Sequence, residues 1–368
     1  MNSRSFAARL RTRLRTALGV LAAVIVALTC AQSSGQEAQA AGASFLRTAT
    51  PLQSLEGAVS WLHSPPLTPP ALQGKVVLLD FWTYSCINCL RTLPYVRAWA
   101  DKYRSLGFIV VGVHTPEFGF EHRPANVERA ASQLGITFPV AVDSRRAIWQ
   151  ALGVQGWPSL YFVDATGRIR DRQVGEGGYE EAERLIQQLL REAGRTGVPR
   201  DLVAPQGTGT QAAPGPMPPG SAETYVGAAR TEGFRSADGG LRPGRTHDYA
   251  PAPALALNEW TLAGNWKVGD ESAELQQAGG RIAYRFRARD LHLVLGPAAE
   301  GPPVRFRVRI DGQPPGADHG SDVNADGFGM IDSHRLYQLV RQSQAGRHRL
   351  FEIEFFDRGA SAYAFTFG

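Results

Sequence analysis

Residues 75–94, KVVLLDFWTYSCINCLRTLP, decide how the first half of the chain is interpreted. Residues 75–82 form an almost continuous apolar run, which is typical of a strand buried on both faces of a sheet. Apolar side chains then recur at helical spacing over residues 89–104. Cys86 and Cys89 lie where the strand turns into the helix. The stretch therefore predicts a strand–turn–helix unit that carries a C-x-x-C pair.

The position of the two cysteines indicates redox chemistry. Cys86 lies at a helix N-terminus, where unpaired N–H groups and the helix dipole stabilise a thiolate. Cys89 lies about one turn further along and is expected to be shielded. We therefore predict that Cys86 attacks a substrate disulfide and that Cys89 resolves the mixed disulfide. A zinc site would need further ligands at suitable spacing, and a structural disulfide across so short a loop would add little stability.

The remainder of the first half alternates strands and helices. The pattern predicts a second buried strand at residues 108–113 and a hairpin of strands 159–163 and 168–174. It predicts helices at residues 126–134 and 179–192. This alternation is typical of an α/β layer around one central sheet.

Residues 197–222 are rich in proline and glycine and are expected to form a linker. After them the hydrophobic period becomes two, at residues 282–286, 304–310, 351–355 and 363–367. Such strands without helical patterns predict an antiparallel β-sandwich. In the last strand the aromatic residues Tyr363, Phe365 and Phe367 are expected to alternate with smaller residues.

The first 40 residues have the features of a signal peptide or an N-terminal anchor. Five arginines precede an apolar run at residues 17–28, and residues 38–40 form an A-x-A cleavage motif. Cleavage would remove Cys30 and leave two cysteines in an oxidising compartment. It would also lower the formal charge from +5 to +1, because the leader holds five arginines and one glutamate. No nucleic-acid partner is therefore predicted.

The sequence LLDFWTYSCINC, at residues 78–89, resembles the active-site strand and turn of the thioredoxin superfamily. Residues 81–96, 112–118 and 175–181 are more narrowly similar to the DipZ type of TlpA-like thioredoxins. In that type a β-sandwich resembling a carbohydrate-binding module commonly follows the redox domain. The resemblance implies a thioredoxin-like α/β domain at residues 41–196. It also implies a jelly-roll or galactose-binding-like all-β sandwich at residues 223–368.

The resemblance also implies roles for individual residues. Asp80 matches the buried acid that exchanges a proton with the inner cysteine, Cys89. Trp82 matches the tryptophan that shields the active site and contributes to substrate binding. Pro158 matches the cis-proline that faces the disulfide, so the backbone of Trp157 would pair with an extended substrate segment. No organic cofactor is expected, because a Cys86–Cys89 disulfide would itself carry the electrons.

These features together predict an exported thiol–disulfide oxidoreductase, acting as a reductase on protein substrates in the bacterial periplasm or cell envelope. Its electrons would come from a separate membrane donor of the CcdA/DsbD type. Gly112 stands where thioredoxin has a lysine beside the buried acid, which leaves the proton path open. Two alternatives are an envelope- or glycan-binding protein with an accessory redox domain and a peroxiredoxin-like peroxidase. The peroxidase hypothesis rests on Thr83 and Cys86, which have the T-x-x-C spacing of peroxiredoxins. Leu79 stands where that motif has a proline.

Two weaker patterns concern the second half. Asp322, Asn324 and Asp326 have the spacing of a calcium loop, but Ser333 stands at the twelfth position, where a glutamate is expected. A turn without metal is the alternative interpretation. Three aromatic residues could stack on sugar rings, although aromatic residues usually fill the core of a sandwich: Trp260, Trp266 and Tyr337.

Overall fold

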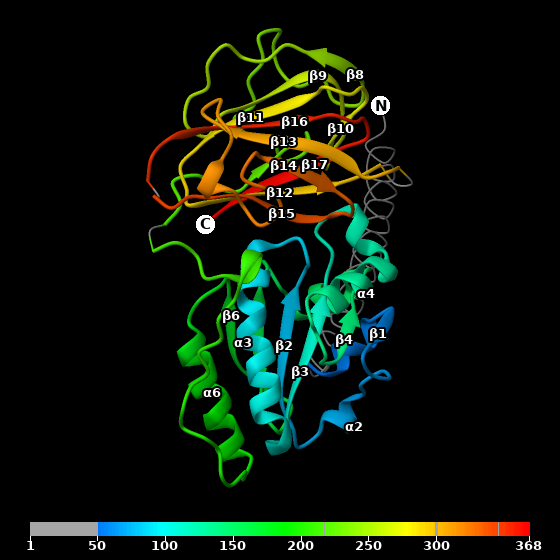
Figure 1. Ribbon diagram of the computed structural model, residues 1–368. Helices are drawn as coiled ribbons and strands as arrows, with labels where there is room; N and C mark the ends of the chain where they lie inside the picture. Colours follow the sequence, from blue (N-terminus) through cyan, green and yellow to red (C-terminus); the bar gives the residue numbers. More distant parts are fainter. Residues whose placement is uncertain (1–50, 217, 299–300, 345) are drawn as a thin grey trace, which may run out of the picture. The chain divides into compact units, whose positions relative to one another are not determined.

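The computed structural model describes residues 51–216, 218–298, 301–344 and 346–368 (Figure 1). The predicted leader, its cleavage motif and Cys30 lie outside these residues. Residues 54–368 form one compact unit. Among the described residues, none of the helices has the length and apolar character needed to cross a membrane.

The first half contains a six-stranded sheet in the order β1-β4-β3-β2-β5-β6. Strands β2, β3 and β4 run parallel, and β1, β5 and β6 pair in antiparallel fashion. The central strand β2 is buried along its whole length, as its continuous apolar run predicts. The strands are β1 (Ser60–Leu62), β2 (Val76–Trp82), β3 (Phe108–His114), β4 (Val140–Val142), β5 (Ser159–Val163) and β6 (Ile169–Val174).

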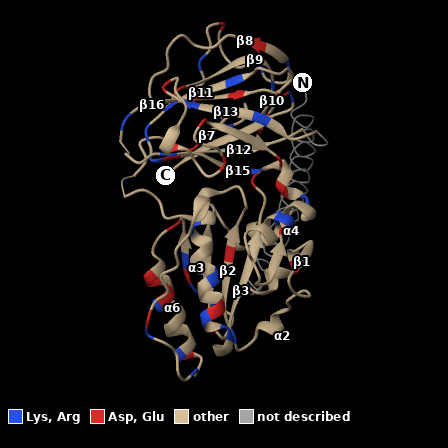
Figure 2. Cartoon of the chain, viewed as in Figure 1, with Lys and Arg blue, Asp and Glu red and all other residues tan. Residues whose placement is uncertain are grey.

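Helices pack beside this sheet. The three predicted helices are confirmed, and each of their ends lies within two residues of the predicted position. The α-helices are α2 (Pro69–Leu72), α3 (Ile87–Tyr103), α4 (Pro124–Gln133), α5 (Ala147–Leu152) and α6 (Tyr179–Glu192). The 3₁₀ turns are η1 (Gln53–Gly57), η2 (Arg104–Leu106), η3 (Gly119–His122), η4 (Gly209–Gln211) and η5 (Gly316–Asp318). Charges of both signs follow α6 in Figure 2. On this helix Arg184 pairs with Glu180 one turn away. Its other face is apolar and packs into the core, with Ile186 and Leu190 buried.

In the second half the described residues form eleven strands that pair with one another in antiparallel fashion, which confirms the predicted all-β domain. The strand order is β14-β13-β16-β11-β9-β10-β17-β12-β15, with β7 beside β17 and β8 beside β9. The strands are β7 (Thr224–Tyr225), β8 (Thr246–Tyr249), β9 (Trp260–Val268), β10 (Ala273–Leu275), β11 (Arg281–Phe286), β12 (Asp290–Gly296), β13 (Val304–Ile310), β14 (Phe328–Ile331), β15 (Arg335–Arg341), β16 (Arg349–Phe355) and β17 (Ser361–Phe367).

Strand β9 links the two layers of the sandwich. Its first four residues pair with β11, and the residues after Gly264 pair with β10. Gly264 has φ +90°, which favours glycine, and a Cβ there would lie 3.2 Å from the Cα of Gly280. The layers meet across one core, in which Tyr284 of β11 contacts Phe365 of β17 at 5.0 Å between ring centroids.

The expected regular alternation along β17 needs correction, because this strand contains a bulge. Leu293 of β12 pairs with Phe365, but Leu295 pairs with Ala362, so β17 has one extra residue between them. Phe365 therefore packs into the sandwich core, whereas Tyr363 turns away and joins the core of the first half.

The proline- and glycine-rich segment at residues 197–222 is held against the first domain. Arg97 of α3 donates a hydrogen bond to the side chain of Gln211 at 2.7 Å. Gln187 of α6 donates to the backbone oxygen of Asp201 at 3.0 Å. These contacts show that the segment packs along α3 and α6, while its exact boundaries as a linker stay predictions.

Candidate active site

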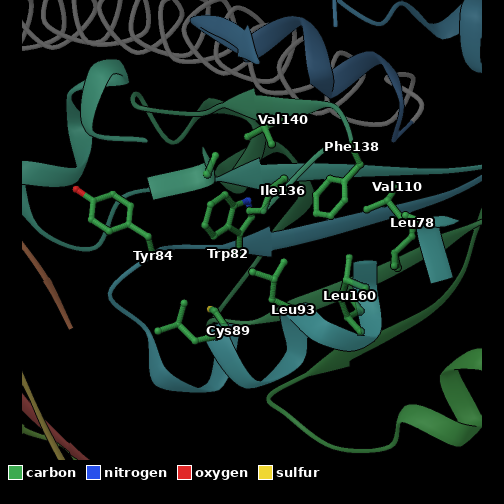
Figure 3. Close-up of a cluster of buried hydrophobic side chains, with 14 of the residues drawn as sticks. Leu78, Trp82, Tyr84, Cys89, Leu93, Val110, Ile136, Phe138, Val140 and Leu160 are labelled. Carbon is green, nitrogen blue, oxygen red and sulfur yellow. The ribbon is translucent and has the colours of Figure 1, made fainter. Parts of the chain in front are cut away.

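The turn from β2 into α3 brings the two cysteines to one face of the sheet. Residues 76, 78, 80 and 82 of β2 alternate with residues that point to the opposite face. Leu78 and Trp82 pack in the same core cluster as Cys89, which places Asp80 on that side too. Figure 3 shows Cys89 on α3 facing Trp82 of β2.

Cys86 is the N-cap residue of α3 and is partly exposed. Its Sγ accepts a hydrogen bond from the backbone N–H of Cys89 at 3.3 Å. This N–H and the positive end of a 17-residue helix favour negative charge on the sulfur. Cys86 therefore has the position and environment of a nucleophile.

Cys89 is buried behind Cys86, with 4% of its surface exposed. Burial, followed by the hydrogen bond and the negative charge of Cys86, raises the pKa of the Cys89 thiol well above its ordinary value. Both cysteines are free thiols in this structure. The inner thiol thus stays protonated until a base removes its proton.

Asp80 is the ionisable side chain on the same face of β2. Burial raises its pKa from 3.8 to about 7, and its charge acts on Cys89. The buried Oδ1 atom has no hydrogen-bond partner. Asp80 pairs in register with Gly112 of β3, the position that the resemblance matches to a lysine of thioredoxin. Its carboxylate can therefore accept a proton near neutral pH without a basic side chain at that position.

The loop before β5 has the geometry that the resemblance implies. The Trp157–Pro158 bond is cis, as predicted. The Trp157 ring lies 4.4 Å from that of Trp149, and Arg146 lies over both rings. Trp157 lines a cleft together with Cys86 and is available to a substrate.

The predicted substrate contact of Trp82 does not fit its position. Only 3% of Trp82 is exposed, and its ring packs edge-on against His114 at 5.1 Å. It belongs to the core cluster that also holds Cys89. Trp82 thus shields the inner cysteine, and its burial keeps it from the surface that a substrate would reach.

Sequence reasoning missed a buried carboxylate that holds the turn before Cys86. Glu121 accepts a 2.6 Å hydrogen bond from Ser85 Oγ. Its second oxygen accepts from the backbone N–H groups of Glu117 and Phe118 at 2.6 and 3.1 Å. Burial raises the pKa of Glu121, which these donors partly offset. No spacing signal marks this residue, because its side-chain partners Ser85 and Thr83 are far away in sequence, Ser85 by 36 positions, and its other partners are backbone groups.

A cleft of about 510 Å³ opens beside Cys86. One side comes from the start of α3 and the Trp157 loop, and the other comes from the sandwich. The structure places Glu117 in the cleft, whereas Glu176 pairs with the buried Arg91 at 3.3 Å. The sandwich residues of the cleft were not predicted, because they come after the linker and lie more than a hundred positions from Cys86 in the sequence.

The calcium-like loop is held by protein contacts. Asp322 pairs with Arg335 at 2.8 Å and accepts a hydrogen bond from the Gln338 backbone N–H. Asn324 Oδ1 accepts from the backbone N–H of Phe328. No group of three or more His, Cys, Asp or Glu side chains able to hold a metal occurs among the described residues. These bonds account for Asp322 and Asn324 as parts of a turn before β14.

The aromatic residues considered for sugar stacking lie in the sandwich core. Each is fully buried: Trp260, Trp266 and Tyr337. The indole N–H of Trp260 donates to the backbone oxygen of Glu232, and that of Trp266 donates to Ala263. These side chains are therefore not available to a glycan.

Comparison with known proteins agrees with this geometry. A family model described as Redoxin matches residues 64–188, and one described as thioredoxin-like C-terminal domain matches residues 221–368. Protein DipZ of Mycobacterium bovis is 37% identical over 261 residues, which are 69% of this chain and 36% of that protein. This chain therefore spans little more than a third of the length of DipZ.

Two shorter relatives match the first domain. The thiol-disulfide oxidoreductase ResA of Bacillus thuringiensis is 28% identical over 118 residues, which are 32% of this chain and 65% of that protein. The thiol-disulfide oxidoreductase YkuV of Bacillus subtilis is 31% identical over 142 residues, which are 39% of this chain. Because that match covers 95% of YkuV and a thioredoxin-like C-terminal domain follows it, the chain belongs to the TlpA/DipZ type of the thioredoxin superfamily.

Proposed function

We propose that the protein is a thiol–disulfide oxidoreductase that reduces disulfides of protein substrates. The observation that carries this proposal is the pairing of a partly exposed Cys86 at the start of α3 with a buried Cys89 behind it. Relatives named thiol-disulfide oxidoreductases support it. The pair of thiols needs no organic cofactor, because it exchanges two electrons by forming a disulfide.

The reaction begins when the Cys86 thiolate attacks one sulfur of the substrate disulfide. The substrate S–S bond breaks, a mixed disulfide forms, and the released thiolate takes a proton from water. Cys89 then gives its proton to Asp80 and attacks Cys86 Sγ. This attack forms the Cys86–Cys89 disulfide and expels the second substrate thiolate, which takes up a proton. Two electrons have then passed from the cysteine pair to the substrate.

The environment of Cys86 supports the reductase direction. Strong oxidants of this class stabilise their reduced form, usually by several groups that favour the thiolate. Here one backbone N–H reaches Cys86 Sγ, and no Lys, Arg or His side chain of the described residues donates to it. The burial of Cys89 also disfavours a second negative charge. The reduced pair is therefore little stabilised and is expected to give up electrons readily.

Each turnover leaves an oxidised cysteine pair, so a dithiol donor must reduce it again. We propose a membrane donor of the CcdA/DsbD type and a location in the bacterial periplasm or cell envelope. The Arg-rich and apolar sequence of residues 1–40 supports export. Fusion of residues 1–60 to a reporter that is active only outside the cytoplasm tests this part independently.

The central experiment traps the mixed disulfide. Cys89→Ser should accumulate a covalent complex with a disulfide peptide that thiol reagents reverse, and Cys86→Ser should form none. Accumulation in the Cys86→Ser variant would reverse the assigned roles. Equilibration of the wild-type pair with defined thiol buffers then gives the direction. We expect a potential below about −250 mV, and a value above about −180 mV would identify an oxidant.

The position of Thr83 argues against a peroxidase. A peroxidatic threonine would have to face the attacking sulfur. Thr83 is fully buried, and its hydroxyl lies 3.4 Å from Nε2 of His114. It therefore packs within the strand end, and peroxide consumption by the reduced protein is expected to stay at the rate of a simple thiol.

A further inference from the structure

The cleft beside Cys86 is bounded by both halves of the chain. The first domain contributes Asn88 of α3 and Trp157 of the cis-proline loop. The sandwich contributes Glu223, Tyr225 and Arg230, which face the same opening. A segment that brings a disulfide to Cys86 must therefore pass residues of the sandwich.

A set of charged and aromatic contacts fixes this side of the cleft. Arg230 pairs with Glu117 at 3.0 Å. Its guanidinium carbon lies 3.6 Å from the ring centroid of Tyr225, which is a close cation–π contact. The Tyr225 hydroxyl lies 2.8 Å from Oε1 of Glu117. Arg230 is thus already committed to Glu117 and Tyr225.

Glu223 has a weaker hold on this guanidinium than Glu117 does, because the charge of Arg230 acts on Glu223 only through space. The Tyr225 hydroxyl also lies 2.9 Å from Oε2 of Glu223, so one hydroxyl proton serves two carboxylates. In the part of the chain that the structure describes, no Lys, Arg or His side chain forms an ion pair with Glu223. The Glu223 residue is exposed, yet desolvation by the neighbouring cleft residues, followed by the charge of Glu117, raises the pKa of its carboxyl, and the Tyr225 hydrogen bond and the charge of Arg230 offset part of this rise. A positive charge brought beside it would relieve this repulsion.

We infer that Glu223 is a specificity-determining residue, which binds a lysine or arginine next to the disulfide of the incoming protein segment. The sandwich then acts as part of the substrate site of the redox domain. Two carboxylates and one guanidinium leave an excess of negative charge in the cleft when both acids are ionised. An acidic residue at the same place in a substrate would meet like charge and bind less well. This inference rests on the proposed oxidoreductase function.

The test uses the full chain with its thiols reduced. Three disulfide peptides differ only in the residues flanking the cysteine, which are Lys, Gln or Glu. The second-order rate constant for oxidation of the protein by each peptide is measured in a single turnover at low and high salt. Wild type should react with the Lys peptide about three to five times faster than with the Gln peptide, and slowest with the Glu peptide. High salt should shrink this ratio.

Glu223→Gln removes the charge and nearly preserves the shape. It should bring the Lys-to-Gln rate ratio close to one. Glu232→Gln is the matched control, because Glu232 is an exposed glutamate of the same segment outside the cleft. It should keep the wild-type ratio. An unchanged ratio in Glu223→Gln overturns the inference, whereas a wild-type protein that reduces none of the three peptides overturns the proposed function instead.

Discussion

Asp80 lies opposite Gly112 in the parallel pairing of β2 and β3, so the buried acid on the Cys89 side has a neighbour without a side chain. Burial alone raises the pKa of Asp80 to about 7. The same burial that prepares this carboxyl to accept a proton also makes its charged form costly. Function and stability therefore make opposite demands on Asp80.

Asp80→Asn should stabilise the reduced protein at neutral pH. The folded pKa lies above the unfolded value of 3.8, so the folded state holds its proton longer and wild type loses stability as pH rises from about 4 to 7. The full difference between the folded and unfolded pKa of Asp80 corresponds to about 4 kcal/mol in the free energy of unfolding. Urea unfolding at pH 7.5 should show most of this gain in the variant, and the gain should vanish at pH 4.

The same variant should be a slower enzyme. Without the carboxylate, Cys89 lacks its proton acceptor, and resolution of the mixed disulfide should slow at least about a hundredfold. Rapid quenching of the reaction separates this step from the attack by Cys86. Equal resolution rates in wild type and Asp80→Asn would remove Asp80 from the mechanism.

Gly112→Ala should destabilise the first domain. A Cβ at this position would lie 3.0 Å from Phe138 Cε2 and 3.0 Å from Trp82 Nε1, both in the packed core. We expect a loss of about 1–3 kcal/mol in urea unfolding. Gly240→Ala is the control, because no heavy atom lies within 4 Å of its Cβ position. If Gly112→Ala lowers the free energy of unfolding no more than the control does, Phe138 and Trp82 move aside at little cost.

Much of the fold could be predicted because the hydrophobic period follows burial directly. Strand β2 reads as a continuous apolar run since both of its faces are covered. In contrast, β4 has three residues and α2 has four, which is too short for a period to show. The bulge in β17 was missed because the extra residue is visible only in the pairing with β12.

The site was predictable only where its residues are neighbours in sequence. Cys86 and Cys89 share one turn, and the cis bond before Pro158 followed from a local motif. Glu121 and Tyr225 reach the site through tertiary contacts with no repeated spacing. The resemblance predicted that Trp82 contributes to substrate binding, but the alternation of side chains along β2 places Trp82 in the core.

Glu121→Ala should loosen the turn that precedes Cys86. The substitution leaves three donors, of which two are buried and that of Glu117 is partly buried, without their acceptor: Ser85 Oγ and the backbone N–H groups of Glu117 and Phe118. We expect a loss of about 3 kcal/mol or more in urea unfolding. Mixed-disulfide formation should slow about tenfold as Cys86 loses its fixed position.

Ser85→Ala provides the comparison for Glu121, because it removes one donor and leaves the two backbone hydrogen bonds intact. Its cost should be about 1 kcal/mol. If Glu121→Ala costs no more than Ser85→Ala, the backbone bonds to the carboxylate contribute little to the turn.

Asp290→Asn should weaken the connection between α3 and the sandwich. Asp290 of β12 is buried and pairs with Arg91 of α3 at 3.4 Å and with Arg289 at 2.7 Å. Removing the anion leaves the buried Arg91 with Glu176 alone, at a cost of about 3 kcal/mol. Hydrogen exchange should therefore rise in both α3 and β12, since the substitution removes the ion pair that joins the two elements. Asp248→Asn, which changes an exposed aspartate of β8, should stay within about 0.5 kcal/mol of wild type. Exchange that rises in β12 while α3 keeps its protection would show that Arg91 does not couple the two elements.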